Sequence, residues 1–272
     1  CTMSDWNRRA AEALEHLRQQ RVLVHNITNY VVMNSTANAL LAAGASPVMA
    51  HAREEVEEMA ALAGAVVLNI GTLEPPWIEA MHLAGAAANR RGTPVILDPV
   101  GAGATAYRTD TARGLARELD IAVVRGNATE ILSLAGVDAE TTGVDAAHEV
   151  EDAARVAADL ASRLETVVAI TGEVDLVTDG STVLRVEAGH SLMGLVTGTG
   201  CTATALTAAF AAVETDFVAA ASGALAYFGI AGERAARRST SPGSFRVALD
   251  DMLYEITAGD LLSEARIHEV RR

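Results

Sequence analysis

The stretch Val196–Leu206, V-T-G-T-G-C-T-A-T-A-L, is the point from which the rest of the chain can be understood. Gly198 and Gly200 lie between threonines and lead into an alanine-rich segment, which predicts a glycine turn followed by a helix. The first amides of a helix lack partners and point outward at the positive end of the helix dipole. We therefore expect an anion site suited to phosphate, with the side chain of Cys201 within reach. The alternative is a glycine-rich helix start that serves only close packing.

Before this turn, short apolar segments rich in β-branched residues alternate with helical patterns. The expected strands are Val22–Val24, Pro47–Met49, Val66–Ile70, Val95–Val100, Ile121–Val124 and Val167–Ile170. The expected helices are a first one capped by Ser4 or Asp5, then Val31–Ala43, Glu54–Ala63, Ile78–Asn89, Thr111–Leu119, Thr129–Ala135 and Ala146–Leu164. This alternation predicts an α/β fold with a mostly parallel central sheet that helices cover on both faces.

The last third of the chain follows a different pattern. Val174–Val186, with Asp179-Gly180 in its middle, predicts a β-hairpin at the edge of the sheet. Only helices are expected after the glycine turn. No linker or repeat divides the 272 residues, so we expect a single domain, 1–272.

Composition narrows the possible partners. The formal net charge of −14 argues against nucleic acid or an anionic membrane surface. All 21 basic residues are arginine, which excludes a lysine-based phosphate loop. Two cysteines form no disulfide framework, so we expect a reducing cytoplasm. The most apolar region, Thr202 to Gly232, is interrupted by Glu214 and Asp216 and therefore predicts buried helices of a soluble protein.

Polar residues or glycines follow nearly every expected strand. They are Asn26, Thr28, Asn69, Gly71, Asp98, Arg125, Asn127 and Thr171. In open parallel sheets ligands bind at the carboxyl ends of the strands, so these residues are candidates for one site. Loops are polar in any case, so the pattern alone adds only modest support.

Two acids in this set suit a magnesium ion. Asp98 opens D-P-V-G-A-G-A-T at a strand end, and Glu130 follows Asn127 in N-A-T-E. Mg²⁺ prefers one or two carboxylates together with phosphate oxygens and retained waters. The alternatives are a turn-initiating aspartate before Pro99 and an ordinary acid at a helix N-terminus.

The remaining candidates suit phosphate chemistry. Arg125 can grip phosphate through its planar set of donors, although a surface ion pair is an equally good interpretation. Thr171 can offer a hydroxyl to a nucleotide, or simply form a turn with Gly172. Cys201 is the group available to orient a hydroxyl or take its proton, or it is a small apolar helix residue. A helix start favours partial ionisation of a thiol and a nearby phosphate opposes it, so we expect a weak base.

Together these residues are the parts that phosphoryl transfer requires, namely positioning and charge neutralisation with little covalent chemistry. A dinucleotide fingerprint is the competing interpretation, because Gly101, Gly103 and Ala106 match G-x-G-x-x-A after a strand. That motif needs an acid at the end of the next strand, where this chain has Arg125, so we reject it.

With these residues assembled, the chain resembles the hydroxyethylthiazole kinase family of thiamine biosynthesis, within the ribokinase-like superfamily. The resemblance covers almost the whole chain in six ordered blocks. They are V-H-N-I-T-N-Y-V-V-M-N (24–34), G-A-S-P-V-M-A (44–50), L-N-I-G-T-L (68–73), V-I-L-D-P-V-G-A-G-A-T (95–105), R-G-N-A-T-E-I (125–131) and V-T-G-T-G-C (196–201). It implies a three-layer α/β/α fold and ATP- and Mg²⁺-dependent phosphorylation of 4-methyl-5-(2-hydroxyethyl)thiazole.

The resemblance also implies residue roles. Arg125 and Thr171 would contact ATP, Asp98 and Glu130 would organise Mg²⁺, and Cys201 would take the place of the aspartate base of ribokinase relatives. Met49 and Gly198 would line the thiazole site, with Asn26 as a neighbour. The resemblance further implies a homotrimer with thiazole sites between subunits, and Val31–Leu41 would then be the neighbouring wall. The chain departs from the family at Leu195, where relatives often have lysine, and at Ser191, where many have proline.

Other functions remain open at this point. Within the same fold, a kinase for another small alcohol or an ATP-dependent dehydratase would usually carry aspartate where Cys201 stands. A thiazole or thiamine sensor would bind its ligand without releasing ADP. The number of candidate phosphate and metal groups disfavours a sensor, because a neutral heterocycle needs none of them.

Overall fold

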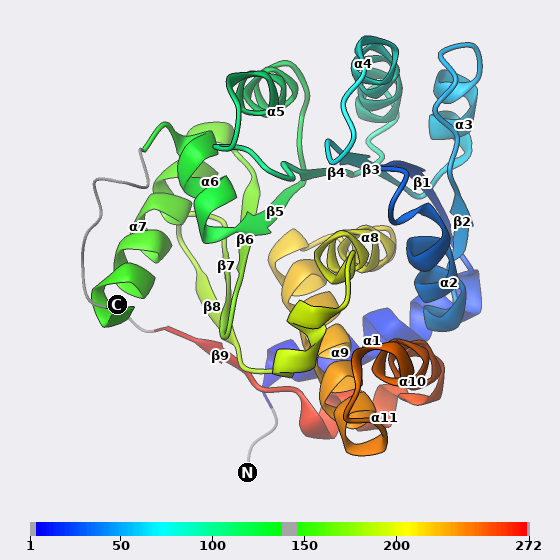
Figure 1. The fold of residues 1–272 in the computed structure, drawn as a ribbon, viewed down its shortest axis with the longest axis vertical. Helices are drawn as coiled ribbons and strands as arrows, with labels where there is room; N and C mark the ends of the chain where they lie inside the picture. Colours follow the sequence, from blue (N-terminus) through cyan, green and yellow to red (C-terminus); the bar gives the residue numbers. More distant parts are fainter. Residues whose placement is uncertain (1–3, 138–145, 271–272) are drawn as a thin grey trace.

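The computed structural model describes residues 4–137 and 146–270, and in it helices cover both faces of a curved central sheet (Figure 1). The strands of these residues are β1 Leu23–Ile27, β2 Ser46–Val48, β3 Ala65–Asn69, β4 Val95–Asp98, β5 Val123–Asn127, β6 Val167–Thr171, β7 Asp175–Thr178, β8 Val183–Val186 and β9 Ile267–Glu269. Their order across the sheet is β2-β1-β3-β4-β5-β6-β7-β8-β9. The pairs from β2 to β6 are parallel and those from β6 to β9 antiparallel, which confirms the predicted mostly parallel sheet.

Two expectations about the end of the chain are wrong. Strand β9 pairs with β8, so the β7–β8 hairpin is not at the edge, and the segment after the glycine turn is not helical throughout. A strand of three residues is too short for its alternation to stand out, and only Ile267 in it is buried. A third difference concerns β5, which extends through Arg125 to Asn127 rather than ending at Val124.

The helices form two layers. They are α1 Asp5–Gln20, α2 Met33–Ala43, α3 Val56–Leu62, α4 Pro75–Asn89, α5 Ala106–Glu118, α6 Ala128–Ala135, α7 Ala146–Leu164, α8 Thr199–Ala211, α9 Phe217–Arg238, α10 Pro242–Glu255 and α11 Ala258–Glu264, with a short 3₁₀ helix, η2, at Ser191–Leu195. Helices α3 to α7 cover one face, and the other helices lie on the opposite side (Figure 1). The predicted cap of α1 is confirmed, because the Ser4 side chain accepts the Asn7 N–H.

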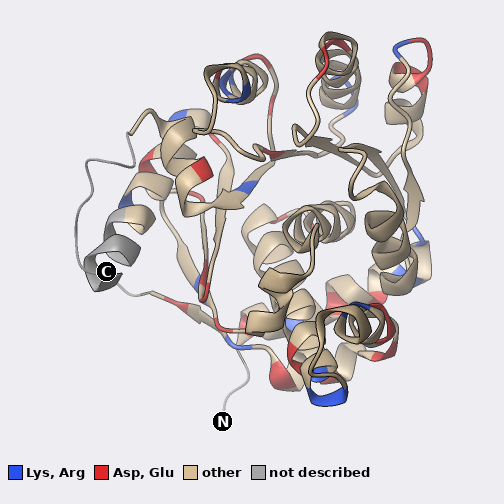
Figure 2. Cartoon of the chain, in the orientation of Figure 1, with Lys and Arg blue, Asp and Glu red and all other residues tan. Residues whose placement is uncertain are grey.

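Helix α8 lies on the concave side of the sheet and carries no charged residue (Figures 1 and 2). Every residue from Thr202 to Ala211 is buried, as expected of a helix that is apolar all round. Its small side chains pack on β1, β3 and β4 on one side and on α9 on the other. This packing holds the start of α8 at the carboxyl ends of the strands. Within the two described ranges, no helix combines the length and apolar character needed to cross a bilayer.

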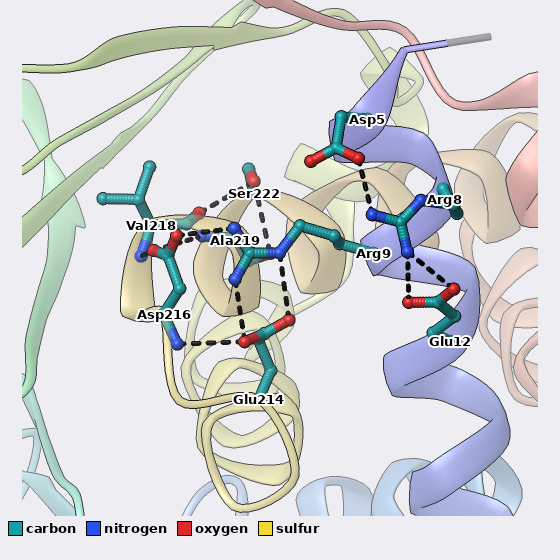
Figure 3. Close-up of polar contacts among 9 residues, drawn as sticks. All are labelled: Asp5, Arg8, Arg9, Glu12, Glu214, Asp216, Val218, Ala219 and Ser222. Carbon is teal, nitrogen blue, oxygen red and sulfur yellow. Dashed lines mark hydrogen bonds and ion pairs between the residues drawn. The ribbon is translucent and has the colours of Figure 1, made fainter.

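The turn between α8 and α9 is tied to the first helix (Figure 3). Arg9 of α1 donates through Nε and Nη2 to the Glu214 carboxylate at 3.2 and 2.9 Å, and through Nη1 to Asp216 at 2.7 Å. Asp216 also caps α9 by accepting the Val218 N–H at 3.0 Å. These contacts link the beginning of the chain to its last third and fix the far end of α8.

Candidate active site

A row of polar side chains runs along the carboxyl edge of the sheet on the face that carries α8. Alternate residues of a strand share a face of the sheet. In each of five strands, an apolar residue of the core on the α8 side is followed two positions later by a polar residue. The apolar residues are Val24, Val67, Ile96, Val123 and Ala169, and the polar ones that follow on the same face are Asn26, Asn69, Asp98, Arg125 and Thr171. The alternation along the strands therefore brings these polar side chains to one edge of the sheet, as predicted.

Asp98 lies at the centre of this row and is fully buried. Its Oδ2 accepts hydrogen bonds from Asn69 Nδ2 at 2.7 Å and from Thr204 Oγ1 of α8 at 2.8 Å. Its Oδ1 has no hydrogen-bond partner and lies 4.0 Å from Arg125 Nη1. Burial raises the pKa of Asp98 to about 6, and the Arg125 charge opposes that rise. Asp98 is thus no simple turn-initiating residue but a buried carboxylate with an oxygen left open.

Arg125 is also buried rather than paired at the surface, so the surface ion-pair interpretation is wrong. Its Nη2 donates to the Thr171 hydroxyl, while its Nε is buried without a partner. A Cβ at Gly200 would lie 2.8 Å from Arg125 Nη1, so the glycine lets the start of α8 approach the guanidinium closely. The structure therefore brings Arg125, Thr171 and the glycine turn together.

Cys201 lies half-buried in the first turn of α8. Gly198 precedes the helix at φ +85° and no side chain caps it, so the first amides of α8 have no capping side-chain acceptor. Burial and then the Asp98 charge raise the pKa of the Cys201 thiol to about 11. The thiol consequently keeps its proton at neutral pH, and the partial ionisation that a helix start favours does not occur in this setting.

Glu130 is held by two backbone groups. Its Oε2 accepts the Asn127 N–H at 2.9 Å, which together with the Asn127 side chain makes a capping box at the start of α6. Its Oε1 accepts the Gly101 N–H at 2.9 Å from the loop after β4. The ordinary role of an acid at a helix start therefore describes Glu130 as it stands. The second contact adds that Glu130 anchors the loop that follows Asp98.

A cavity of about 710 Å³ opens beside Arg125, between the end of β6, the start of β7, the start of α8 and one face of α9. The residues lining it are Arg125, Thr171, Gly172, Glu173, Asp175, Ala188, Gly189, His190, Ser191, Met193, Gly194, Thr199, Gly200, Ala203, Leu225, Phe228 and Gly229. The lining combines polar groups such as Arg125 and Thr171 with apolar residues such as Leu225 and Phe228, on which a flat ring could pack. Ser191 lies in this lining, whereas the side chain of Leu195 is exposed.

None of the three residues expected at the thiazole is part of the lining of this cavity. Asn26 is buried near the end of β1, with its Oδ1 unpartnered, and Met49 follows β2 half-buried. Both strands lie on the side of β4 opposite to β5 and β6. Gly198 connects the two sides, because a Cβ there would lie 2.6 Å from Val32 Cγ1, just before α2. Asp98 and Cys201 thus lie between two distinct regions of the edge.

Asn69 was among the strand-end candidates, but three other residues of this edge were not predicted from the sequence. Thr204 bonds Asp98, and its position three residues after Cys201 on the same helix could have suggested it. Asn29 donates to Asn69 from the loop after β1, and Asp175 lines the cavity at the start of β7. No sequence pattern marks the last two.

The residues of this edge suit a hard cation that takes some of its ligands from the protein and the others from a bound phosphate. Within residues 4–137 and 146–270, no group of three or more His, Cys, Asp or Glu could hold a metal ion without other ligands. The unpartnered Oδ1 of Asp98 is an oxygen donor of the type that Mg²⁺ prefers. The donor set therefore fits an ion that depends on substrate oxygens.

The fold is that of a ribokinase-like α/β protein. It has a curved, mostly parallel sheet, groups suited to phosphate at the carboxyl edge of that sheet, and a glycine turn that opens a buried helix. A ribokinase-like superfamily protein of known structure from Enterococcus faecalis has the same fold, with a TM-score of 0.65 at 13% identity over 91% of this chain and 95% of that one.

The sequence comparisons are more specific. Residues 14–259 match the sequence model of the Hydroxyethylthiazole kinase family. A hydroxyethylthiazole kinase from Desulfotalea psychrophila is 55% identical over 267 residues, covering 98% of each chain. The structure of a hydroxyethylthiazole kinase protein from Pyrococcus horikoshii superposes with a TM-score of 0.89 at 48% identity, covering 96% of this chain and 99% of that one. This chain belongs to the hydroxyethylthiazole kinase family.

Proposed function

We propose that the protein transfers the terminal phosphoryl group of ATP to the hydroxyl of 4-methyl-5-(2-hydroxyethyl)thiazole, in thiamine biosynthesis or salvage. The family supports a kinase that acts on this alcohol. One observation of the structure carries the proposal. The start of α8, which carries the half-buried Cys201, lies between a nucleotide-sized cavity lined by Arg125 and Thr171 and the buried Asp98.

On the nucleotide side, ATP occupies the cavity with its base toward Leu225 and Phe228 and its phosphates toward Arg125. The guanidinium and the Thr171 hydroxyl bind phosphate oxygens, and the uncapped amides of α8 face the group that is transferred. These donors are in place before the reaction, so they stabilise the charge that builds during transfer at little reorganisation cost.

On the acceptor side, the thiazole lies near Met49, Gly198 and Asn26. Cys201 orients the hydroxyl toward the phosphoryl group. Its thiol is a poor proton acceptor at neutral pH, and a loose transition state asks little of a base.

Asp98 and Glu130 would hold Mg²⁺, directly or through water, and the ion would supply neutralisation of the phosphate charge when bound. The open Oδ1 of Asp98 supports this assignment. Glu130 reaches the same loop through its bond to Gly101, and its charge raises the pKa of Asp98, which a cation would reverse.

We also propose a cytoplasmic homotrimer in which a neighbouring subunit completes the thiazole site. The side chains of Tyr30, Val31 and Leu41 are 57, 69 and 59% exposed at the start and along one side of α2, near the expected acceptor region. Exposed apolar residues of this size suit a contact with another subunit. Small molecules are the only ligands proposed, with no nucleic acid or membrane partner.

The test is ADP release from ATP, with and without the hydroxyethylthiazole, at several Mg²⁺ concentrations. We expect release that requires both the alcohol and the metal, with thiazole phosphate as product, and a mass in solution of three chains. A protein that binds the thiazole tightly and releases no ADP is a sensor, and that result would overturn the proposal.

A further inference from the structure

Four side chains form a continuous hydrogen-bonded relay from the sheet to helix α8, and we call Asp98, Asn69, Asn29 and Cys201 the amide relay. Asn69 Nδ2 donates to Asp98 Oδ2 at 2.7 Å, and Asn29 Nδ2 donates to Asn69 Oδ1 at 3.0 Å. The same Asn29 nitrogen lies 3.5 Å from Cys201 Sγ. The two asparagines and Asp98 are all at most 5% exposed.

The direction of each bond in the relay is determined by its neighbours. The Asp98 carboxylate accepts, so the Asn69 atom facing it is the nitrogen, and Asn69 Oδ1 must face the other way. That oxygen also accepts the Gly71 N–H at 3.0 Å. Asn29 Oδ1 accepts the Val31 N–H at 3.1 Å, which leaves the Asn29 nitrogen to serve both Asn69 and the sulfur.

The relay is also enclosed. A Cβ at Gly71 would lie 2.5 Å from Asn29 Nδ2 and 2.9 Å from Asn29 Cβ, so the backbone of Gly71 lies directly against the Asn29 side chain. A buried amide whose oxygen accepts a backbone N–H and whose nitrogen donates to a second amide has one orientation available. The Asn29 N–H therefore reaches the sulfur from a fixed direction.

We propose that Asn29 is a positioning residue for phosphoryl transfer, because its N–H fixes the orientation of the Cys201 thiol that faces the acceptor alcohol. This inference rests on the proposed function of the site. With one sulfur lone pair receiving the Asn29 N–H, the second is left for the substrate hydroxyl. Without that bond the thiol rotates freely, and a small misplacement of a reacting group lowers the rate substantially.

Asn29→Asp separates this role from loop formation. Aspartate keeps the oxygen that accepts the Val31 N–H but loses the donor to Asn69 and Cys201. We expect kcat to fall about tenfold to a hundredfold, while KM for ATP and for the thiazole changes less than about threefold. Gln20→Glu makes the same amide-to-acid change on the exposed end of α1 and should leave both constants unchanged. Asn29→Ala, which adds no charge, should lower kcat in the same direction and serves if the aspartate variant does not fold.

A double-mutant cycle tests whether Asn29 acts through the thiol. In a Cys201→Ala background, Asn29→Asp should lower kcat by no more than about twofold further. A full additional loss in that background, or an unchanged kcat in the parent, would overturn the inference. If Cys201→Ala has no measurable turnover, the infrared S–H band decides. In Cys1→Ser protein that band should shift with Asn29→Asp and not with Gln20→Glu, and an unshifted band also overturns the inference.

The two proposals fail differently. If the parent enzyme releases no ADP with the thiazole, the proposed function is wrong, and the infrared band still reports whether Asn29 contacts the sulfur. If the parent is active and the cycle is additive, only the role of Asn29 is wrong.

Discussion

Two cavities of comparable volume open at opposite ends of the same parallel strands. One, of about 710 Å³, lies at the carboxyl ends, and the other, of about 590 Å³, lies at the amino ends, where Pro94, Ala122 and Thr166 precede β4, β5 and β6. Volume therefore does not distinguish them. What differs is the state of the polar groups that each cavity contains.

At the amino-end cavity several of the polar groups are already paired. The backbone of Asp120 exchanges two hydrogen bonds with the Asn89 side chain, and the Asp179 carboxylate accepts the N–H groups of Ser181 and Thr182. At the carboxyl-end cavity Arg125 Nε is buried without a partner, and nearby Asp98 Oδ1 is too. Buried polar groups without partners are costly, so they are expected where a ligand supplies the missing contacts.

The largest expected effect is that of Arg125→Ala. Removing the phosphate-binding guanidinium should lower kcat/KM for ATP by about a thousandfold, since a charged, buried contact to a charged ligand is lost. Arg91→Ala, an exposed arginine beside the amino-end cavity, should change it less than about twofold. Steady-state ADP release measures both. Equal losses in the two variants would remove the distinction between the cavities.

Two glycines sharpen the contrast with opposite outcomes. In Gly200→Ala the new Cβ lies 2.8 Å from Arg125 Nη1, so the guanidinium must move, and kcat/KM for ATP should fall about tenfold or more with little change in Tm. Gly92 at the amino-end cavity has φ +68° and open space around it. Gly92→Ala should therefore destabilise the fold by about 1 kcal/mol and leave activity intact. Thermal melts and ADP assays on both variants decide, and the reverse pattern would contradict the assignment.

Glu130→Gln should raise the Mg²⁺ concentration for half-maximal activity severalfold and leave KM for the thiazole unchanged. Glutamine replaces one of the two oxygens that accept a backbone N–H with an NH₂ group, which cannot accept. The cap of α6 should therefore weaken, and the free energy of unfolding should fall by about 1 kcal/mol. Glu165→Gln, which makes the same change at the amino-end cavity, should alter neither quantity. A thiazole KM that shifts more than the Mg²⁺ requirement would rule out the metal role.

The smallest effects are on stability, and their signs differ between the cavities. Burial raises the pKa of Asp175 to about 6, so its ionisation destabilises the folded state as pH rises from about 4 to 6. Asp175→Asn keeps the acceptor for the Gly172 N–H and should gain about 1–3 kcal/mol above pH 6, with the gain vanishing below about pH 4.

Asp179 at the amino-end cavity should behave in the opposite way. Burial acts to raise its pKa, but hydrogen bonds from Thr182 and Ser181 outweigh burial and lower it. Its ionised form therefore stabilises the fold above the unfolded pKa, and that contribution is lost as pH falls through the lower, folded pKa. Asp179→Asn should lower Tm at pH 7 and have little effect at the acidic end. Melting curves between pH 3 and 8 test both signs, and parallel shifts for the two variants would contradict this account.

The sequence predicts the central sheet and the row of residues on it because both follow from strand alternation. Asp98 and Arg125 end or nearly end apolar strands, and parallel pairing brings such positions together without further information. Asn29 and Asp175 lie in a loop and at the start of a hairpin, so their contacts depend on tertiary packing that no local pattern encodes. The sequence does not predict strand β9 for the same reason, since these three residues form a strand only by pairing with β8.

The contacts of α1 have a consequence for synthesis on the ribosome. This helix leaves the ribosome well before α9 and α11, yet its apolar side packs on them, and Arg9 is paired with residues of the turn before α9. Until those helices leave the exit tunnel, Ala10, Leu14 and Leu17 lack most of the native surface that covers them. Until then the nascent chain carries a partly uncovered amphipathic segment, which is a natural place for a chaperone to bind.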